Sequence, residues 1–105
     1  MKTNRTNSKS ARGTASGLLA ARQYSAAGLT RKLLERGYDD AEVGAVVDEF
    51  TELGYLDDLE FARSIIRHYK DKGLHRVRYE LYKRGIGRET GAEALEILEE
   101  DGDLF

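Results

Sequence analysis

A pattern of apolar residues, one basic residue and one glycine occurs twice in this chain, with a spacing of 48 residues. In both copies, apolar residues stand at positions i, i+4 and i+5, followed by a basic residue, a glycine and another apolar residue. Apolar residues at this spacing indicate a helix, and the glycine indicates where the helix ends. Helical units that recur at a fixed period are typical of repeat proteins, which usually bind a partner rather than catalyse a reaction. The copies are Leu29-x-x-x-Leu33-Leu34-x-Arg36-Gly37-Tyr38 and Val77-x-x-x-Leu81-Tyr82-x-Arg84-Gly85-Ile86.

The rest of the chain also has the pattern of short helices, and we predict an all-α fold made of tandem three-helix repeats. Eleven glycines and no proline among 105 residues suit short helices that end at glycine. We predict a disordered basic tail over residues 1–14, because no apolar periodicity supports order there. One three-helix repeat is expected over residues 15–55, a second over residues 56–100, and an acidic end over residues 101–105.

The helix boundaries are predicted from local signals. Asp39 with Glu42 and Asp57 with Glu60 have the spacing of reciprocal helix caps. Leu81 is expected in the core, and Leu34, Leu53 and Tyr82 are placed on the inward-facing stripes of their helices. Four glycine–apolar pairs are expected to end helices in the same way, with the apolar residue folding back onto the helix that precedes it. These pairs are Gly37-Tyr38, Gly54-Tyr55, Gly73-Leu74 and Gly85-Ile86.

Charge alternates in blocks along the chain. Residues 1–38 carry eight basic side chains and one acidic side chain, and residues 39–62 carry nine acidic ones. Residues 63–88 carry nine basic and two acidic side chains, and residues 89–105 carry seven acidic ones. The simpler interpretation is that neighbouring basic and acidic helices attract each other across solvated edges, at about 0–1 kcal/mol per exposed pair. The alternative is that basic helices form one surface that meets a polyanion or an acidic groove.

The residue types give little support for catalysis. There is no cysteine, which excludes disulfides and thiolate metal sites, and His68 and His75 lack the spacing of metal ligands. The paired carboxylates precede helical patterns, where capping explains them. We therefore expect a protein that is not an enzyme and has no cofactor, metal or small-molecule substrate. The lack of cysteine fits a cytoplasmic protein, which we expect, and no apolar run approaches the ~20 residues that span a membrane.

Basic side chains interleaved with tyrosines on the fourth and fifth predicted helices are the candidate binding residues. Tyr69 and Tyr82 fall on the apolar stripes and are expected to pack in the core, whereas Tyr79 is expected to be exposed. Stacking of such a ring on a nucleic-acid base is a conceivable role. The candidate partner-binding residues are Arg63, Arg67, Lys70, Arg76, Arg78, Tyr79, Lys83 and Arg84.

Three segments carry a resemblance to a known family. The string Gly54-Tyr55-Leu56-Asp57-Asp58-Leu59-Glu60-Phe61-Ala62-Arg63 resembles the most characteristic motif of the RecX regulatory family. So do Glu80-Leu81-Tyr82-Lys83-Arg84-Gly85-Ile86 and, upstream, Ser25 with Leu29, Lys32 and Leu33. These anchors lie in the family's order over residues 15–98.

The resemblance implies an elongated, curved array of three-helix repeats. It also implies a bacterial protein that binds the RecA recombinase filament, lies in its groove and restrains its ATPase, strand-exchange and coprotease activities. Three features depart from the family pattern: Gly28 stands where Glu is usual, the turn from Gly73 to Arg76 is short, and two repeats are present where three are usual.

Two other functions fit the residues. A helix-turn-helix type of nucleic-acid-binding module would contact phosphates, including those of single-stranded DNA, through Arg76, Arg78, Arg84 and Arg88. The near-neutral total charge argues against DNA as the only partner. A self-associating interaction module is the second alternative.

Overall fold

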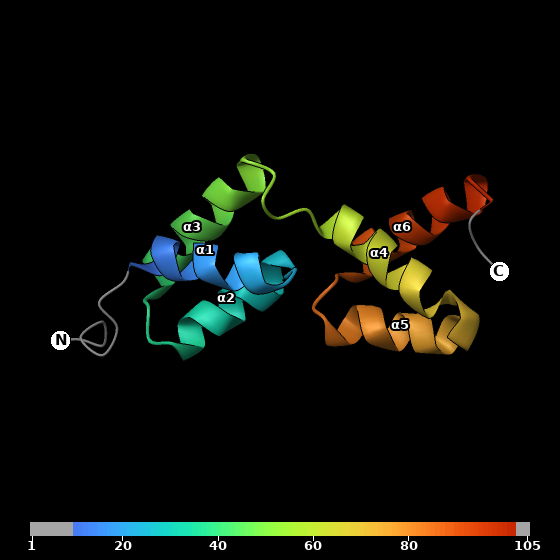
Figure 1. Cartoon of the computed structure of the whole chain (residues 1–105), viewed down its shortest axis with the longest axis horizontal. Coiled ribbons are helices and arrows are strands. Elements are labelled where there is room, and N and C mark those ends of the chain that lie inside the picture. Colours follow the sequence, from blue (N-terminus) through green and yellow to red (C-terminus); the bar gives the residue numbers. More distant parts are fainter. Residues whose placement is uncertain (1–9, 103–105) are drawn as a thin grey trace. The chain divides into compact units, whose positions relative to one another are not determined.

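The computed structural model describes residues 10–102, and in this part of the chain it contains helices and turns but no strand. The all-α prediction is confirmed. Within residues 10–102, six α-helices and one short 3₁₀ helix follow one another (Figure 1). They are α1 (Ala11–Ala21), α2 (Ala26–Glu35), α3 (Asp40–Glu52), α4 (Asp58–Tyr69), η2 (Lys70–Lys72), α5 (Leu74–Lys83) and α6 (Arg88–Glu100).

The chain divides after Leu56 into two compact units of three α-helices each, and each unit has a core of its own. Unit 1 buries apolar side chains from α1, α2 and α3 around Phe50, and unit 2 buries side chains from α4, α5 and α6 around Ile66. Isolated helices of this length are marginal in water, so each trio depends on this mutual burial for its stability.

The first helix begins earlier than expected. Ser10 caps α1 by accepting a hydrogen bond from the Gly13 N–H at 3.1 Å, and Ala11 lies fully buried in the core of unit 1. The predicted tail over residues 1–14 was therefore wrong from Ser10 onward, and residues 1–9 lie outside the described part. Arg12, which was assigned to the tail, instead binds the Glu49 carboxylate of α3 through Nε and Nη2 at 2.9–3.2 Å.

The 48-residue repeat extends over a whole helix pair in each unit. Positions Val43, Val46 and Phe50 of α3 correspond in sequence to Gly91, Ala94 and Leu98 of α6, and all six are buried. On α2 and α5, the buried Leu29 and Leu33 correspond in the same way to Val77 and Leu81. The same positions thus point inward in both copies, although their side chains differ in size.

Three of the four predicted glycine stops have the expected geometry. Gly37, Gly54 and Gly85 adopt positive φ, and the next amide bonds back to the helix, from Tyr38 to Leu33 O, from Tyr55 to Phe50 O and from Ile86 to Leu81 O. Gly73 differs. It follows the 3₁₀ turn η2 and stands at the N-cap of α5, so Leu74 begins the next helix instead of folding back.

The predicted caps form only in part. The carboxylates of Asp39 and Asp57 accept the expected bonds from the amides of Glu42 and Glu60 at 2.8 and 3.0 Å. The Glu42 carboxylate, however, accepts from the Ala11 N–H at 3.1 Å and so ties α3 to the start of α1. Ser25 caps α2 through the Gly28 N–H at 2.9 Å.

Leu34, Leu53 and Tyr82 were wrongly placed on inward stripes. Leu34 is 39% exposed, Leu53 52% and Tyr82 80%. Leu34 and Tyr82 occupy the i+5 position of their repeats, which lies about 140° around a helix from position i. The residues at i and i+4 are buried in both copies, as the apolar pattern predicts, but the i+5 residue faces away from the core.

Candidate functional site

The centre of the α4–α5 region is a buried carboxylate held by two arginines. Glu80 lies on the inner face of α5 and is only 2% exposed. Its carboxylate accepts a hydrogen bond from Arg76 Nε at 2.7 Å and a second one from Arg84, one turn before and one turn after it on α5. Arg84 also donates to the Tyr69 hydroxyl of α4 at 3.2 Å. Both guanidinium groups lie over the Tyr69 ring, so this cluster joins α5 to the end of α4.

The ion pairs set the protonation of this cluster. Hydrogen bonds from Arg76 and Arg84 lower the pKa of Glu80, against the opposing effect of burial. The hydrogen bond to Glu80 likewise raises the pKa of Arg76. Glu80 is therefore a carboxylate at neutral pH, and the arrangement serves to anchor a helix rather than to transfer protons.

The eight predicted partner-binding residues separate into groups. Arg76 and Arg84 are engaged by Glu80, so a part of their charge is neutralised within unit 2. Arg63 is partly buried and pairs with Glu60 at 3.5 Å. Of the remaining residues, Arg67 on α4 is exposed and Lys70 in η2 is half-buried. Three more lie exposed on α5: Arg78, Tyr79 and Lys83, whose Nζ lies 5.8 Å from the centroid of the Tyr79 ring.

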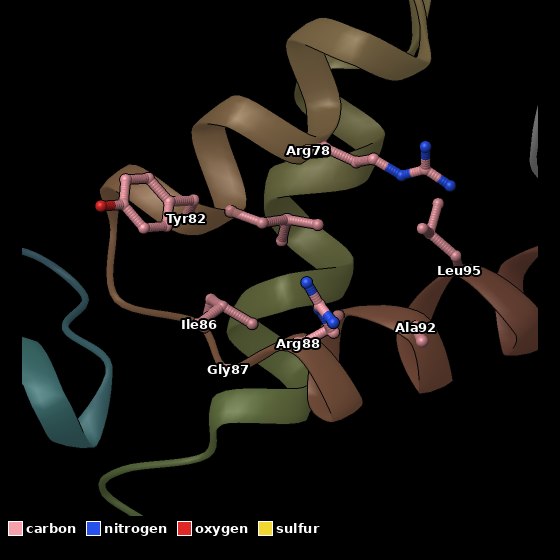
Figure 2. A pocket seen from close by; sticks show the side chains of 9 residues that line it. Arg78, Tyr82, Ile86, Gly87, Arg88, Ala92 and Leu95 are labelled. Carbon is pink, nitrogen blue, oxygen red and sulfur yellow. The ribbon is translucent and has the colours of Figure 1, made fainter.

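Sequence reasoning missed a pocket between α5 and α6, which has a volume of about 540 Å³. Its floor is apolar, and two arginines stand at its edge: Arg78 reaches from α5 toward Leu95 of α6, while Arg88 projects from the first turn of α6 (Figure 2). Tyr82 lines the other end. Neither arginine has an ion-pair or side-chain hydrogen-bond partner among residues 10–102. The lining residues are Arg78, Leu81, Tyr82, Ile86, Gly87, Arg88, Gly91, Ala92 and Leu95.

A sequence signal for this pocket existed. Gly91, which lines the pocket, stands where the first repeat has Val43. Small residues at inward positions leave space between helices, which the comparison of the two copies shows but the apolar pattern alone does not.

The described residues show no cluster of three or more His, Cys, Asp or Glu side chains that could hold a metal ion. Within the same part of the chain, no helix is long and apolar enough to cross a membrane.

Two family profiles match the two units in order. The first three-helix domain of RecX matches residues 11–50, and the second matches residues 57–95. The chain belongs to the RecX family. The two matches begin where the observed helices begin, because the RecX first domain starts with α1 at Ala11 and the second starts at Asp57, the N-cap of α4.

Curated RecX proteins from several bacteria are similar over most of the chain. Regulatory protein RecX of Prosthecochloris aestuarii is 35% identical over 92 residues, which cover 85% of this chain and 61% of that protein. Its counterpart in Stenotrophomonas maltophilia is 40% identical over 88 residues, covering 81% and 53%. That of a Mycobacterium species is 37% identical over 81 residues, covering 74% and 44%. The chain thus spans between about two fifths and three fifths of the length of these RecX relatives.

Proposed function

We propose that this RecX-family regulator binds the RecA–DNA filament and inhibits its ATPase, strand-exchange and coprotease activities. Membership of the RecX family carries the proposal, because both three-helix domains are matched in order. The charge of the chain supports it, since residues 63–88 carry nine bases against two acids and a filament on DNA is rich in phosphate.

The outer side of α5 offers the best candidates for direct contact. Arg78, Tyr79 and Lys83 lie at its surface, where none of them is needed to hold Glu80. Arg67 of α4 and Lys70 of η2, the two elements that precede α5, contribute further positive charge. Arg76 and Arg84 hold the buried Glu80 carboxylate. Their replacement would destabilise the fold, so a loss of binding could not be separated from a loss of folding.

The test is RecA ATP hydrolysis stimulated by single-stranded DNA, with this chain added in increasing amounts. We expect inhibition by the wild-type chain and a large loss of inhibition by the double variant Arg78→Glu/Lys83→Glu. The double variant Arg31→Glu/Arg36→Glu changes the net charge equally on exposed positions of α2 and at its end, and it should inhibit as the wild type does. Unchanged ATP hydrolysis at saturating excess of the wild-type chain would refute the proposal.

Exposed tyrosines favour a second candidate function, direct binding of single-stranded DNA. Tyr79 and Tyr82 are 55% and 80% exposed and lie beside arginines, an arrangement that suits stacking on bases. Binding to an oligothymidylate in the absence of RecA, measured across salt concentrations, separates the two functions. A steep salt dependence would support the nucleic-acid module, because each phosphate contact releases counterions.

A further inference from the structure

The residues at the α5–α6 pocket of unit 2 differ from those at the corresponding positions of unit 1. The helix pair α2–α3 has the same inward positions, and there Val43 and Val46 are buried and belong to the core of unit 1. In unit 2 these positions hold Gly91, which lines the pocket, and Ala94, which belongs to the core of unit 2. A Cβ at Gly91 would lie 3.4 Å from Leu81 Cδ1 and 3.9 Å from Ile86 Cγ2, which are ordinary contact distances. A larger residue is therefore not excluded by backbone contact, yet the second repeat leaves this volume open.

The edge of the pocket differs between the repeats in charge as well. Arg78 corresponds in sequence to Thr30, and Arg88 corresponds to Asp40. Both changes make the second copy more positive at the place where it is also hollowed. Since Arg88 stands in the first turn of α6, where a positive charge is unfavourable to the helix dipole, the stability of α6 does not explain it. The smaller residue at position 91 and the added positive charge thus occur together at one site.

The chemistry of the lining indicates what fits. The floor consists of aliphatic side chains and glycines, and the side-chain donors of the lining, those of Arg78, Arg88 and Tyr82, stand at its edge. An apolar side chain would bury there without leaving polar groups unsatisfied. The two guanidinium groups at the edge match carboxylates on either side of such an anchor. The volume of about 540 Å³ is ample for one large side chain.

We propose that this pocket docks an acidic segment of a protein partner, with one large apolar side chain of that segment seated between α5 and α6. The inference rests on the proposed function for the partner being a protein, and it adds the chemical class of segment that this partner must present. Arg78 and Arg88 hold the flanking carboxylates, and Leu81, Ile86 and Leu95 contact the apolar anchor.

The first experiment titrates the isotope-labelled full chain with a short acetylated peptide in which one Phe is flanked on both sides by Asp and Glu. We expect amide shifts in the NMR spectrum that are concentrated between residues 78 and 95. Replacing the Phe by Ser, or the acidic residues by Lys, should weaken binding at least about tenfold. Shifts that do not concentrate on α5 and α6, or equal binding of the Ser peptide, would overturn the proposal.

Variants of the chain test the same site from the protein side. Ala92→Trp fills the pocket from its exposed edge and should abolish peptide binding, whereas Ala45→Trp, at an exposed position of α3 in unit 1, should bind as the wild type does. Arg78→Glu and Arg88→Glu should each weaken binding at least about tenfold, and Arg31→Glu in unit 1 should not. Far-UV circular dichroism checks that each variant is folded. Unchanged binding by Ala92→Trp would refute the assignment.

Two further measurements test whether nucleic acid or a second copy of the chain occupies the pocket instead. An oligothymidylate that shifts the same amides with comparable affinity would overturn the proposal in favour of nucleic acid. Shifts of these amides with protein concentration alone would overturn it in favour of a second copy of the chain. The RecA ATPase assay is run in parallel. Peptide binding without ATPase inhibition would refute the proposed function and leave the pocket assignment standing, and inhibition without peptide binding would do the reverse.

Discussion

At the scale of single residues, the buried charge of Glu80 helps to hold α5 against α4. A buried carboxylate with one partner missing is costly, and here both oxygens are engaged, one by Arg76 and the other by Arg84. Tyr69 then links the arrangement to α4 through its hydroxyl and its ring. The three charges thus behave as one unit, and replacement of either arginine leaves the buried Glu80 carboxylate without a full set of partners.

Glu80→Gln should therefore lower the melting temperature, and the loss should depend on pH. Because the pKa of Glu80 is lowered in the folded chain, its ion pairs stabilise the fold above its ordinary value of 4.5 and are lost as the pH falls through the lowered value. The difference in melting temperature between wild type and variant should be largest near neutral pH and shrink in acid. Thermal melts followed by circular dichroism across pH measure it. Glu93→Gln, at an exposed position, is the control, and a difference that stays constant with pH would contradict the prediction.

Truncation of two adjacent residues on α5 should affect stability to very different extents. Leu81 is 5% exposed in the core of unit 2, so Leu81→Ala should reduce the free energy of unfolding by about 2–5 kcal/mol. Tyr82 is exposed, and Tyr82→Ala should change it by only about 0.5 kcal/mol or less. Urea unfolding followed by circular dichroism compares them. Similar losses for both variants would mean that Tyr82 packs inward after all.

At the scale of helices, two glycines near the pocket have opposite roles. Gly85 ends α5 with φ of 83°, a conformation that is unfavourable for other residues, so Gly85→Ala should destabilise the chain by about 1 kcal/mol. Gly91 lies inside α6, and its substitution by Ala should stabilise the chain by about 0.5–1 kcal/mol, since the new Cβ meets Leu81 and Ile86 only at contact distance. Urea unfolding of both variants checks the sign, and a loss of stability in Gly91→Ala would mean that the inner face of α6 has no room.

Most helices could be predicted from the sequence because their signals are local. Apolar spacing and the glycine stops at Gly37, Gly54 and Gly85 depend on residues within one or two turns. The misplaced start of α1 has a different cause, because Ser10 to Thr14 lack an apolar stripe and are ordered by contacts with distant residues. Ala11 packs in the core and donates to Glu42, and Thr14 lies 2.7 Å from the Tyr38 hydroxyl. No pattern within residues 1–14 encodes those contacts.

At the scale of the whole molecule, the candidate site was predictable in its charge but not in its shape. The excess of bases over residues 63–88 can be counted in the sequence, whereas the engagement of Arg76 and Arg84 by Glu80 depends on which face of α5 turns inward. The pocket depends on volumes contributed by two helices together. In the sequence, the only sign of the pocket is found by aligning the two copies, which places Gly91 at the position of Val43.

The division of the chain into two units makes a last prediction about cooperativity. Each core cluster consists of residues from one unit only, with Leu33 in the first and Leu81 in the second. If each core stabilises its own unit, Leu33→Ala should speed amide hydrogen exchange in α1, α2 and α3 and leave α4, α5 and α6 close to wild type, and Leu81→Ala should do the opposite. Hydrogen exchange followed by NMR under native conditions measures both variants. Faster exchange across all six helices in either variant would show instead that the two cores unfold as one.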